Sequence, residues 1–147
     1  MQAPQNGEAD IGKLGKIAFA GGWYLYVGSA FGSGGVRARV RRHAHGSGKL
    51  HWHIDYLLRK TGVDEVWYAA EKQKTEEQWV QAIRNTGEGY NPLTGFGSGD
   101  CGCSGHLFHF NEKPDIEDFQ NWLKNAVTEM PELKQVQGRE EVKKVFE

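Results

Sequence analysis

The stretch Gly22-Trp23-Tyr24-Leu25-Tyr26-Val27-Gly28-Ser29-Ala30 decides the fold of this chain. Side chains alternate along a β-strand, so Trp23, Leu25 and Val27 are expected on one face. Tyr24 and Tyr26 then share the opposite face. The strand ends in glycine and is followed by a segment rich in arginine. We therefore expect an aromatic strand that leads into a basic helix, with two phenols directed toward that helix.

The basic segment is expected to form a helix over residues 36–45. Arg39 and His43 are four residues apart, so they project from one helix face, and three further arginines spread over the other faces: Arg37, Arg41 and Arg42. A guanidinium binds a phosphate in fork geometry, and a neutral imidazole accepts or relays a proton. A solvated basic helix is the alternative. The adjoining phenols favour a phosphate site, because buried phenols need hydrogen-bond partners.

Hydrophobic periodicity predicts a mixed α/β (α+β) fold, in which a small central antiparallel sheet of about three strands is flanked by helices. Residues 1–10 are polar and are expected to form a flexible leader, residues 11–110 a domain, and residues 111–147 an acidic helix and a tail. A turn at residues 21–22 predicts a hairpin. Strands are also expected at 11–19, 63–70 and 106–110, and helices at 50–60, 76–86 and 115–127.

Composition and charge narrow the class of protein. A chain of 147 residues fits one domain, and its net charge of −1 argues against wholesale coating of nucleic acid. Residues 33–60 nevertheless carry seven basic side chains against one acidic one, which is compatible with contact to a short stretch of phosphate backbone. No signal sequence or membrane-spanning run is present, and the two cysteines are one residue apart. We expect a cytoplasmic protein with reduced thiols and no membrane partner.

Two further blocks contain residues that could carry chemistry. On the helix expected at 50–60, His51 and Asp55 share a face, so Asp55 could fix the tautomer of His51; a helix whose polar groups satisfy a neighbouring loop is an equal alternative. Residues 101–109 contain a Cys-x-Cys pair and two histidines: Cys101, Cys103, His106 and His109. These could bind zinc in a small interaction protein, but the spacing is tight and the histidines would lie on opposite faces of a strand. A glycine-rich turn with buried free thiols is favoured over zinc.

Several blocks together resemble the GIY-YIG nuclease superfamily and, more specifically, its DUF123 branch. They occur in the same order as in that family and span roughly residues 11–110. The blocks are Gly12–Ile17, Tyr24–Ala30, Arg39 with Arg42 and His43, His51–Leu58, Gly95–Gly97, Asp100 with Cys101, and His106–Phe108. The loose Tyr-x-Gly, Arg and His pattern alone is not specific.

The resemblance implies hydrolysis of phosphodiester bonds with one Mg²⁺ or Mn²⁺ ion. By position, Tyr26 matches the tyrosine of the second motif half, Arg39 the phosphate-binding arginine, and His43 the histidine one turn later. Glu76 matches the metal-binding glutamate, although its neighbour Glu77 is the alternative by one position. A glutamate at a helix start is also favoured by the helix dipole alone.

DNA is expected as the substrate in preference to RNA, in DNA repair. The residues expected to bind the nucleic acid are Arg37, Arg41, Arg42, Lys49 and His51. Residues 1–10 contain no Gly-x-Tyr strand, which the superfamily carries as its first motif half. Tyr24 could substitute for the tyrosine of that strand. The alternative function is therefore a catalytically degenerate module that binds nucleic acid without cutting it.

Overall fold

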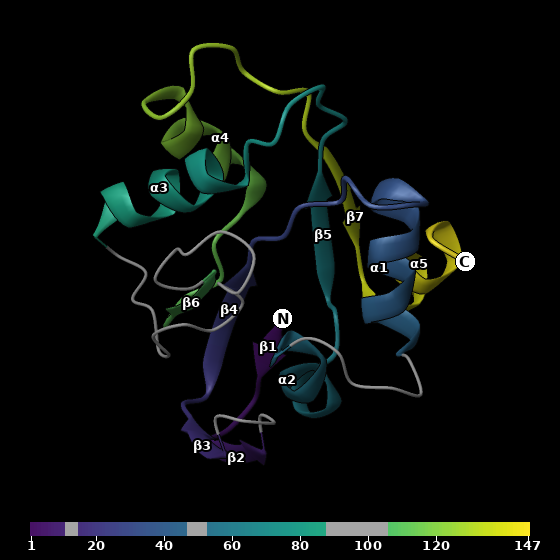
Figure 1. The fold of residues 1–147 in the computed structure, drawn as a ribbon. Coiled ribbons are helices and arrows are strands. Elements are labelled where there is room, and N and C mark those ends of the chain that lie inside the picture. The colour runs from purple at the N-terminus through teal and green to yellow at the C-terminus, as the bar shows by residue number, and fades with distance from the viewer. Residues whose placement is uncertain (11–14, 47–52, 88–105) are drawn as a thin grey trace.

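A computed structural model describes residues 1–10, 15–46, 53–87 and 106–147 (Figure 1). Five helices and small antiparallel sheets make a mixed α/β fold over these residues, as the sequence predicts. The strands are β1 (Gln2–Ala3), β2 (Gly7–Asp10), β3 (Lys16–Phe19), β4 (Gly22–Tyr26), β5 (Glu65–Tyr68), β6 (Leu107–Phe110) and β7 (Lys134–Gln137). The helices are α1 (Gly35–His45), α2 (His53–Thr61), α3 (Glu76–Thr86), α4 (Ile116–Lys124) and α5 (Arg139–Val145).

Strand β4 is the middle strand of a three-stranded antiparallel sheet with the order β1-β4-β6. Trp23 is opposite Phe110 of β6 on one side and Gln2 of β1 on the other. Two further antiparallel pairs are present: β2 with β3 lies beyond the lower end of β4, and β5 with β7 lies to the right of the sheet (Figure 1). The aromatic strand is thus an interior strand.

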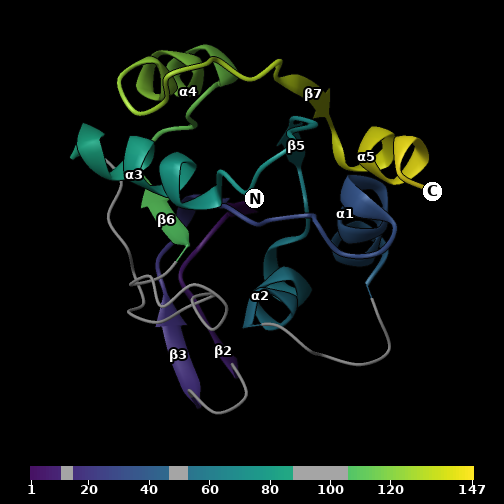
Figure 2. The ribbon, with the colours of Figure 1, turned by 45° about the horizontal axis from the view of Figure 1, so that its top comes forward.

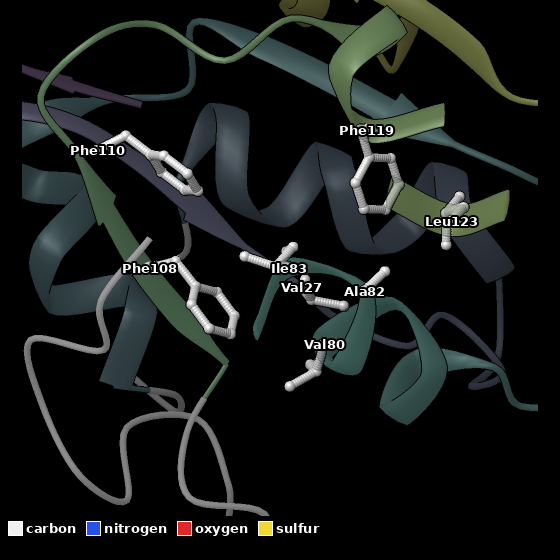
Figure 3. Close-up of a cluster of buried hydrophobic side chains, with 8 residues drawn as sticks. All are labelled: Val27, Val80, Ala82, Ile83, Phe108, Phe110, Phe119 and Leu123. Carbon is white, nitrogen blue, oxygen red and sulfur yellow. The ribbon is translucent and has the colours of Figure 1, made fainter. Parts of the chain in front are cut away.

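Both faces of β4 pack against hydrophobic clusters, and the alternation expected from the sequence is confirmed. Trp23, Leu25 and Val27 pack into a cluster with α3, β6 and α4 (Figure 3). Tyr24 and Tyr26 pack on the opposite side, against β1, β2 and α2. This packing fixes the register in which β4 pairs with its neighbours. A shift of one residue would move the side chains of each face to the opposite face of the sheet.

The helices form pairs around the sheet. Helix α3 lies beside α4, and α1 lies beside α5, in both views (Figure 2). Helix α4 begins with a capping box, in which Asp115 accepts a hydrogen bond from the backbone N–H of Asp118 and the Asp118 carboxylate accepts one from Asp115. Helix α3 ends at Gly87, whose φ of 67° lies in the left-handed region that favours glycine.

The flexible leader expected at residues 1–10 is wrong. Residues 2–3 and 7–10 form β1 and β2, and Ala3 and Ala9 are only 2% and 3% exposed. Strand β2 pairs with β3, so the hairpin expected between residues 11–19 and β4 is wrong as well. These strands are short and mostly polar, and their few apolar contacts are small alanine side chains, which hydrophobic periodicity does not detect.

The C-terminal tail is also more ordered than its sequence indicates. Residues 134–137 form β7 on β5, and Arg139–Val145 forms α5. Val136, Val142 and Phe146 are buried against side chains of α1 and β5. The C-terminal segment therefore completes the core beneath α1. No helix in the described parts of the chain is long and apolar enough to span a membrane.

Leu123 tests the core that holds β4. Its side chain is fully buried between α3, α4 and β6, so Leu123→Ala removes buried methyl groups and leaves a cavity. We expect the free energy of unfolding to fall by about 2–5 kcal/mol in urea titrations. Val145→Ala is the control, because Val145 is 44% exposed. Equal losses in the two variants would contradict this description of the core.

Candidate active site

A cavity of about 450 Å³ lies between β4 and β5. Consecutive residues of both strands line it, at 23–31 and 63–71. Neighbouring side chains of a strand point to opposite faces. Because consecutive residues line the cavity, the cavity lies along the edges of the two strands and not over one face. Helices α1 and α3 add side chains from either side. The cavity is therefore enclosed by the end of β4, the basic helix and the start of α3.

All five residues expected in a catalytic or metal site line this cavity: Tyr24, Tyr26, Arg39, His43 and Glu76. Tyr26 comes from β4, Arg39 and His43 from one face of α1, and Glu76 from the first turn of α3. Arg39 and His43 were expected to project from one face of the helix, and both residues line the same cavity.

Gly28 allows the Arg39 side chain to approach the end of β4. A Cβ atom at Gly28 would lie 3.0 Å from both Nε and Nη2 of Arg39. Such a contact is too tight for a guanidinium group at its present position. The glycine that follows the strand therefore has a steric role, which is to leave room for the arginine beside the strand end.

Asp55 of α2 holds the basic helix α1 in place. One carboxylate oxygen lies 2.7 Å from Nη2 of Arg42, and the other lies 3.4 Å from Nδ1 of His43. The Asp55 side chain is only 7% exposed, so its charge is compensated by the guanidinium of Arg42 rather than by water. Asp55 was expected to orient His51, which lies outside the described residues. Among the described residues, Asp55 contacts Arg42 and His43 of α1.

His43 is neutral at pH 7. Burial, and after it the positive charge of Arg39, lowers the pKa of His43 from 6.5 to about 4, although Asp55 acts in the opposite direction. The His43 ring meets the Tyr26 ring edge-on, with 6.2 Å between the ring centres. A neutral imidazole beside a phenol and a guanidinium can accept a proton or a hydrogen bond.

Glu76 is held by a histidine at the start of β6. Oε1 of Glu76 lies 2.8 Å from Nδ1 of His106, off the direction of a straight N–H hydrogen bond. The side chain of His106 is 1% exposed, whereas that of Glu76 is 17% exposed and reaches the cavity. Glu77 is exposed. Of the two neighbouring glutamates, Glu76 is thus the one at the cavity.

Tyr24 lines the cavity but is almost completely buried. It is 2% exposed, and its hydroxyl donates a hydrogen bond of 2.6 Å to the carbonyl oxygen of Ala20. Its ring meets His109 edge-on. The phenol is therefore engaged in holding the β3–β4 connection, and a part of Tyr24 in catalysis stays a prediction.

The two histidines of the suggested zinc set do not face one site. His106 lies against Glu76, whereas the Nε2 atom of His109 lies 2.9 Å from the carbonyl oxygen of Gly21, on the opposite side of the sheet. Cys101 and Cys103 lie outside the described residues. Within the described ranges no group of three or more His, Cys, Asp or Glu side chains is placed to hold a metal ion.

The residues expected to bind nucleic acid are dispersed. Both Nε and Nη2 of Arg37 donate hydrogen bonds to the backbone carbonyl oxygen of Glu147, and Arg42 pairs with Asp55. Arg41 is exposed on α1. Lys49 and His51 lie outside the described residues. Sequence reasoning did not anticipate these pairings, because each partner is distant along the chain.

Comparison with known proteins identifies a family. A family model described as "Domain of unknown function DUF123" matches residues 1–129, which extends the resemblance beyond residues 11–110 at both ends. No curated protein and no solved structure matches the chain.

The lowered pKa of His43 predicts a pH dependence of stability. Between pH 6.5 and about 4 the unfolded chain binds a proton at His43, whereas the folded chain does not. The free energy of unfolding should therefore fall by about 3 kcal/mol as the pH decreases through this window. Urea titrations of the native protein and of His43→Gln, from pH 7 to 4, measure the difference. Parallel pH curves for the two proteins would contradict the buried neutral imidazole.

Proposed function

The chain belongs to the DUF123 family, and we propose that it is a GIY-YIG-like, divalent-metal-dependent endonuclease that cleaves phosphodiester bonds in DNA. The observation that carries the proposal is the shared cavity of Tyr26, Arg39, His43 and Glu76. A phenol, a guanidinium, a neutral imidazole and one carboxylate are the groups that hydrolysis of a phosphodiester requires. The resemblance to the superfamily, which the sequence suggests, implies these roles for Tyr26, Arg39, His43 and Glu76.

Arg39 would bind the scissile phosphate. Its guanidinium lies against the backbone of Gly28, so the side chain is positioned before substrate arrives, and its fixed fork of donors matches two phosphate oxygens. Negative charge increases on those oxygens as the phosphorus becomes pentavalent. A preorganised positive group at that point lowers the barrier, because it does not need to reorient during the reaction.

His43 and Tyr26 would orient and deprotonate the attacking water. His43 is neutral at pH 7 because its pKa is about 4. Both of its ring nitrogens are buried, so its imidazole would accept a hydrogen bond from water after a small rotation toward the cavity. The edge-on contact with Tyr26 places the phenol next to the imidazole. With so low a pKa, His43 orients water more effectively than it removes a proton, and the proton of the water would pass to Tyr26 in its phenolate form.

Glu76 fits the role of the single carboxylate that binds Mg²⁺ or Mn²⁺. It is partly exposed in the cavity, which leaves space for the water ligands that Mg²⁺ retains when it binds through one carboxylate. When bound, such an ion supplies Lewis-acid polarisation of a phosphate oxygen. The suggested zinc set has no comparable support, because His106 and His109 face different sides of the sheet.

Binding of DNA beyond the scissile phosphate would depend on the exposed surface of α1. Arg41 is exposed there, and Lys49 and His51 follow α1 in the sequence. Arg37 and Arg42 are already engaged with Glu147 and Asp55, so their contribution to DNA binding would be smaller than their charge suggests. The reduced cysteines expected from the sequence favour action in the cytoplasm. DNA undergoing repair is the substrate that the family resemblance suggests.

A nucleic-acid-binding module without catalysis is the second candidate. It is favoured by the placement of Tyr24, whose hydroxyl is bonded to Ala20 and is not directed at a substrate. Strand β1 contributes no tyrosine beside Tyr26. In this candidate Arg39 and Arg41 hold the phosphate backbone, and Glu76 has no part in binding.

Cleavage of branched, flapped and plain duplex DNA with Mg²⁺ or Mn²⁺ separates the two candidates. We expect cutting that EDTA abolishes. Arg39→Ala should lower the cleavage rate by about 10²–10³-fold, because it removes a preorganised charge from the transition state. Glu76→Gln should abolish metal-dependent cutting while leaving DNA binding in a gel-shift assay intact.

Two matched variants control this assay. Glu77→Gln alters the exposed neighbour of Glu76, and Arg59→Ala removes an exposed arginine of α2 that is remote from the proposed roles. Both should cut at the native rate. DNA binding without cutting under all metal conditions would reject the nuclease in favour of the binding module.

A further inference from the structure

The side chain of His106 has no role in the proposed mechanism, although it is almost completely buried against the carboxylate that the mechanism uses. It is 1% exposed, and its Nδ1 atom lies 2.8 Å from Oε1 of Glu76. A nitrogen and a carboxylate oxygen attract each other at this distance only when the nitrogen carries hydrogen. His106 therefore holds a protonated Nδ1 in close contact with one oxygen of Glu76, although the N–H does not point straight at that oxygen.

We propose that His106 is a positioning residue, which fixes one oxygen of Glu76 and so directs the other toward a divalent cation in the cavity. This inference rests on the proposed function and deepens it. Metal-binding side chains depend on partners that orient them, and loss of such a partner commonly weakens metal binding by about 10–100-fold. Glu76 is in the first turn of α3 and is partly exposed, so without His106 its carboxylate would sample several rotamers.

The backbone of His106 is fixed independently of its side chain. The N–H of Val27 donates a hydrogen bond of 3.0 Å to the carbonyl oxygen of His106, which joins the end of β4 to the start of β6. A substitution at residue 106 keeps this bond. The position of the His106 side chain next to the end of β4 is therefore fixed by the backbone. It lies on the same side of the sheet as α3.

His109 provides a matched comparison within the same strand. It is 3% exposed, lies three residues away and contacts the carbonyl oxygen of Gly21 instead of a carboxylate. A substitution at His109 disturbs a buried histidine of β6 to a similar degree, but it does not touch Glu76. Any effect that is common to both positions reports on the fold and not on the carboxylate.

The test is titration of the full chain with Mn²⁺, followed by electron paramagnetic resonance of the free ion. We expect His106→Leu to raise the Kd for Mn²⁺ about tenfold or more. His106→Asn places an amide N–H near the position of Nδ1 and should restore most of the affinity, whereas His106→Gln, which reaches toward the position of Nε2, should not. His109→Asn should leave the Kd unchanged.

The outcomes separate this inference from the proposed function. If Glu76→Gln abolishes Mn²⁺ binding but His106→Leu and His106→Gln both bind as the native protein does, the positioning role is wrong and the metal site stands. Equal weakening by His109→Asn would also overturn it. Unchanged Mn²⁺ binding in Glu76→Gln would reject the metal site itself, and the positioning role with it.

Discussion

Packing of β4 against hydrophobic clusters on both faces is the constraint on which the rest of the structure depends. Leu25 and Val27 pack toward α3 and α4, while Tyr24 and Tyr26 pack toward α2 and β1. Because neither face tolerates a shift of one residue, the end of β4 has a defined position. Gly28 at that end leaves room for the guanidinium of Arg39, which a Cβ atom there would crowd. The position of the candidate site therefore follows from the packing of one strand.

Compensated burial of charge connects the fold to the chemistry. Asp55 of α2 and Arg42 of α1 form an ion pair that stabilises the packing of the two helices. The same packing excludes water from the side chain of His43. A buried Asp55 carboxylate without Arg42 would be strongly unfavourable. The ion pair therefore disfavours other arrangements of α1 and α2. On the other side of the cavity, His106 and Glu76 form a second buried contact. The two contacts hold opposite walls of the same site.

The sequence predicted those features that depend on local periodicity. The helix at 76–86, the alternation along β4 and the shared face of Arg39 and His43 all follow from spacing within one element. What it did not predict depends on partners far along the chain: Asp55 with Arg42, His106 with Glu76, and β7 with β5. Strands β1 and β2 were missed because they bury small alanine side chains in mostly polar segments. Tyr24 was assigned to the site because alternation shows which face a side chain takes, but not how deeply it is buried.

The central claim is that the cavity between β4, α1 and α3 is one metal and phosphate site. Paramagnetic broadening by Mn²⁺ in the ¹⁵N–¹H spectrum of the full chain tests it most directly. The account predicts that substoichiometric Mn²⁺ broadens the amide signals of Glu76, His106 and Gly28, while those of β7 and α5 remain sharp. Broadening that is centred away from Glu76, or the same broadening in Glu76→Gln, would contradict it.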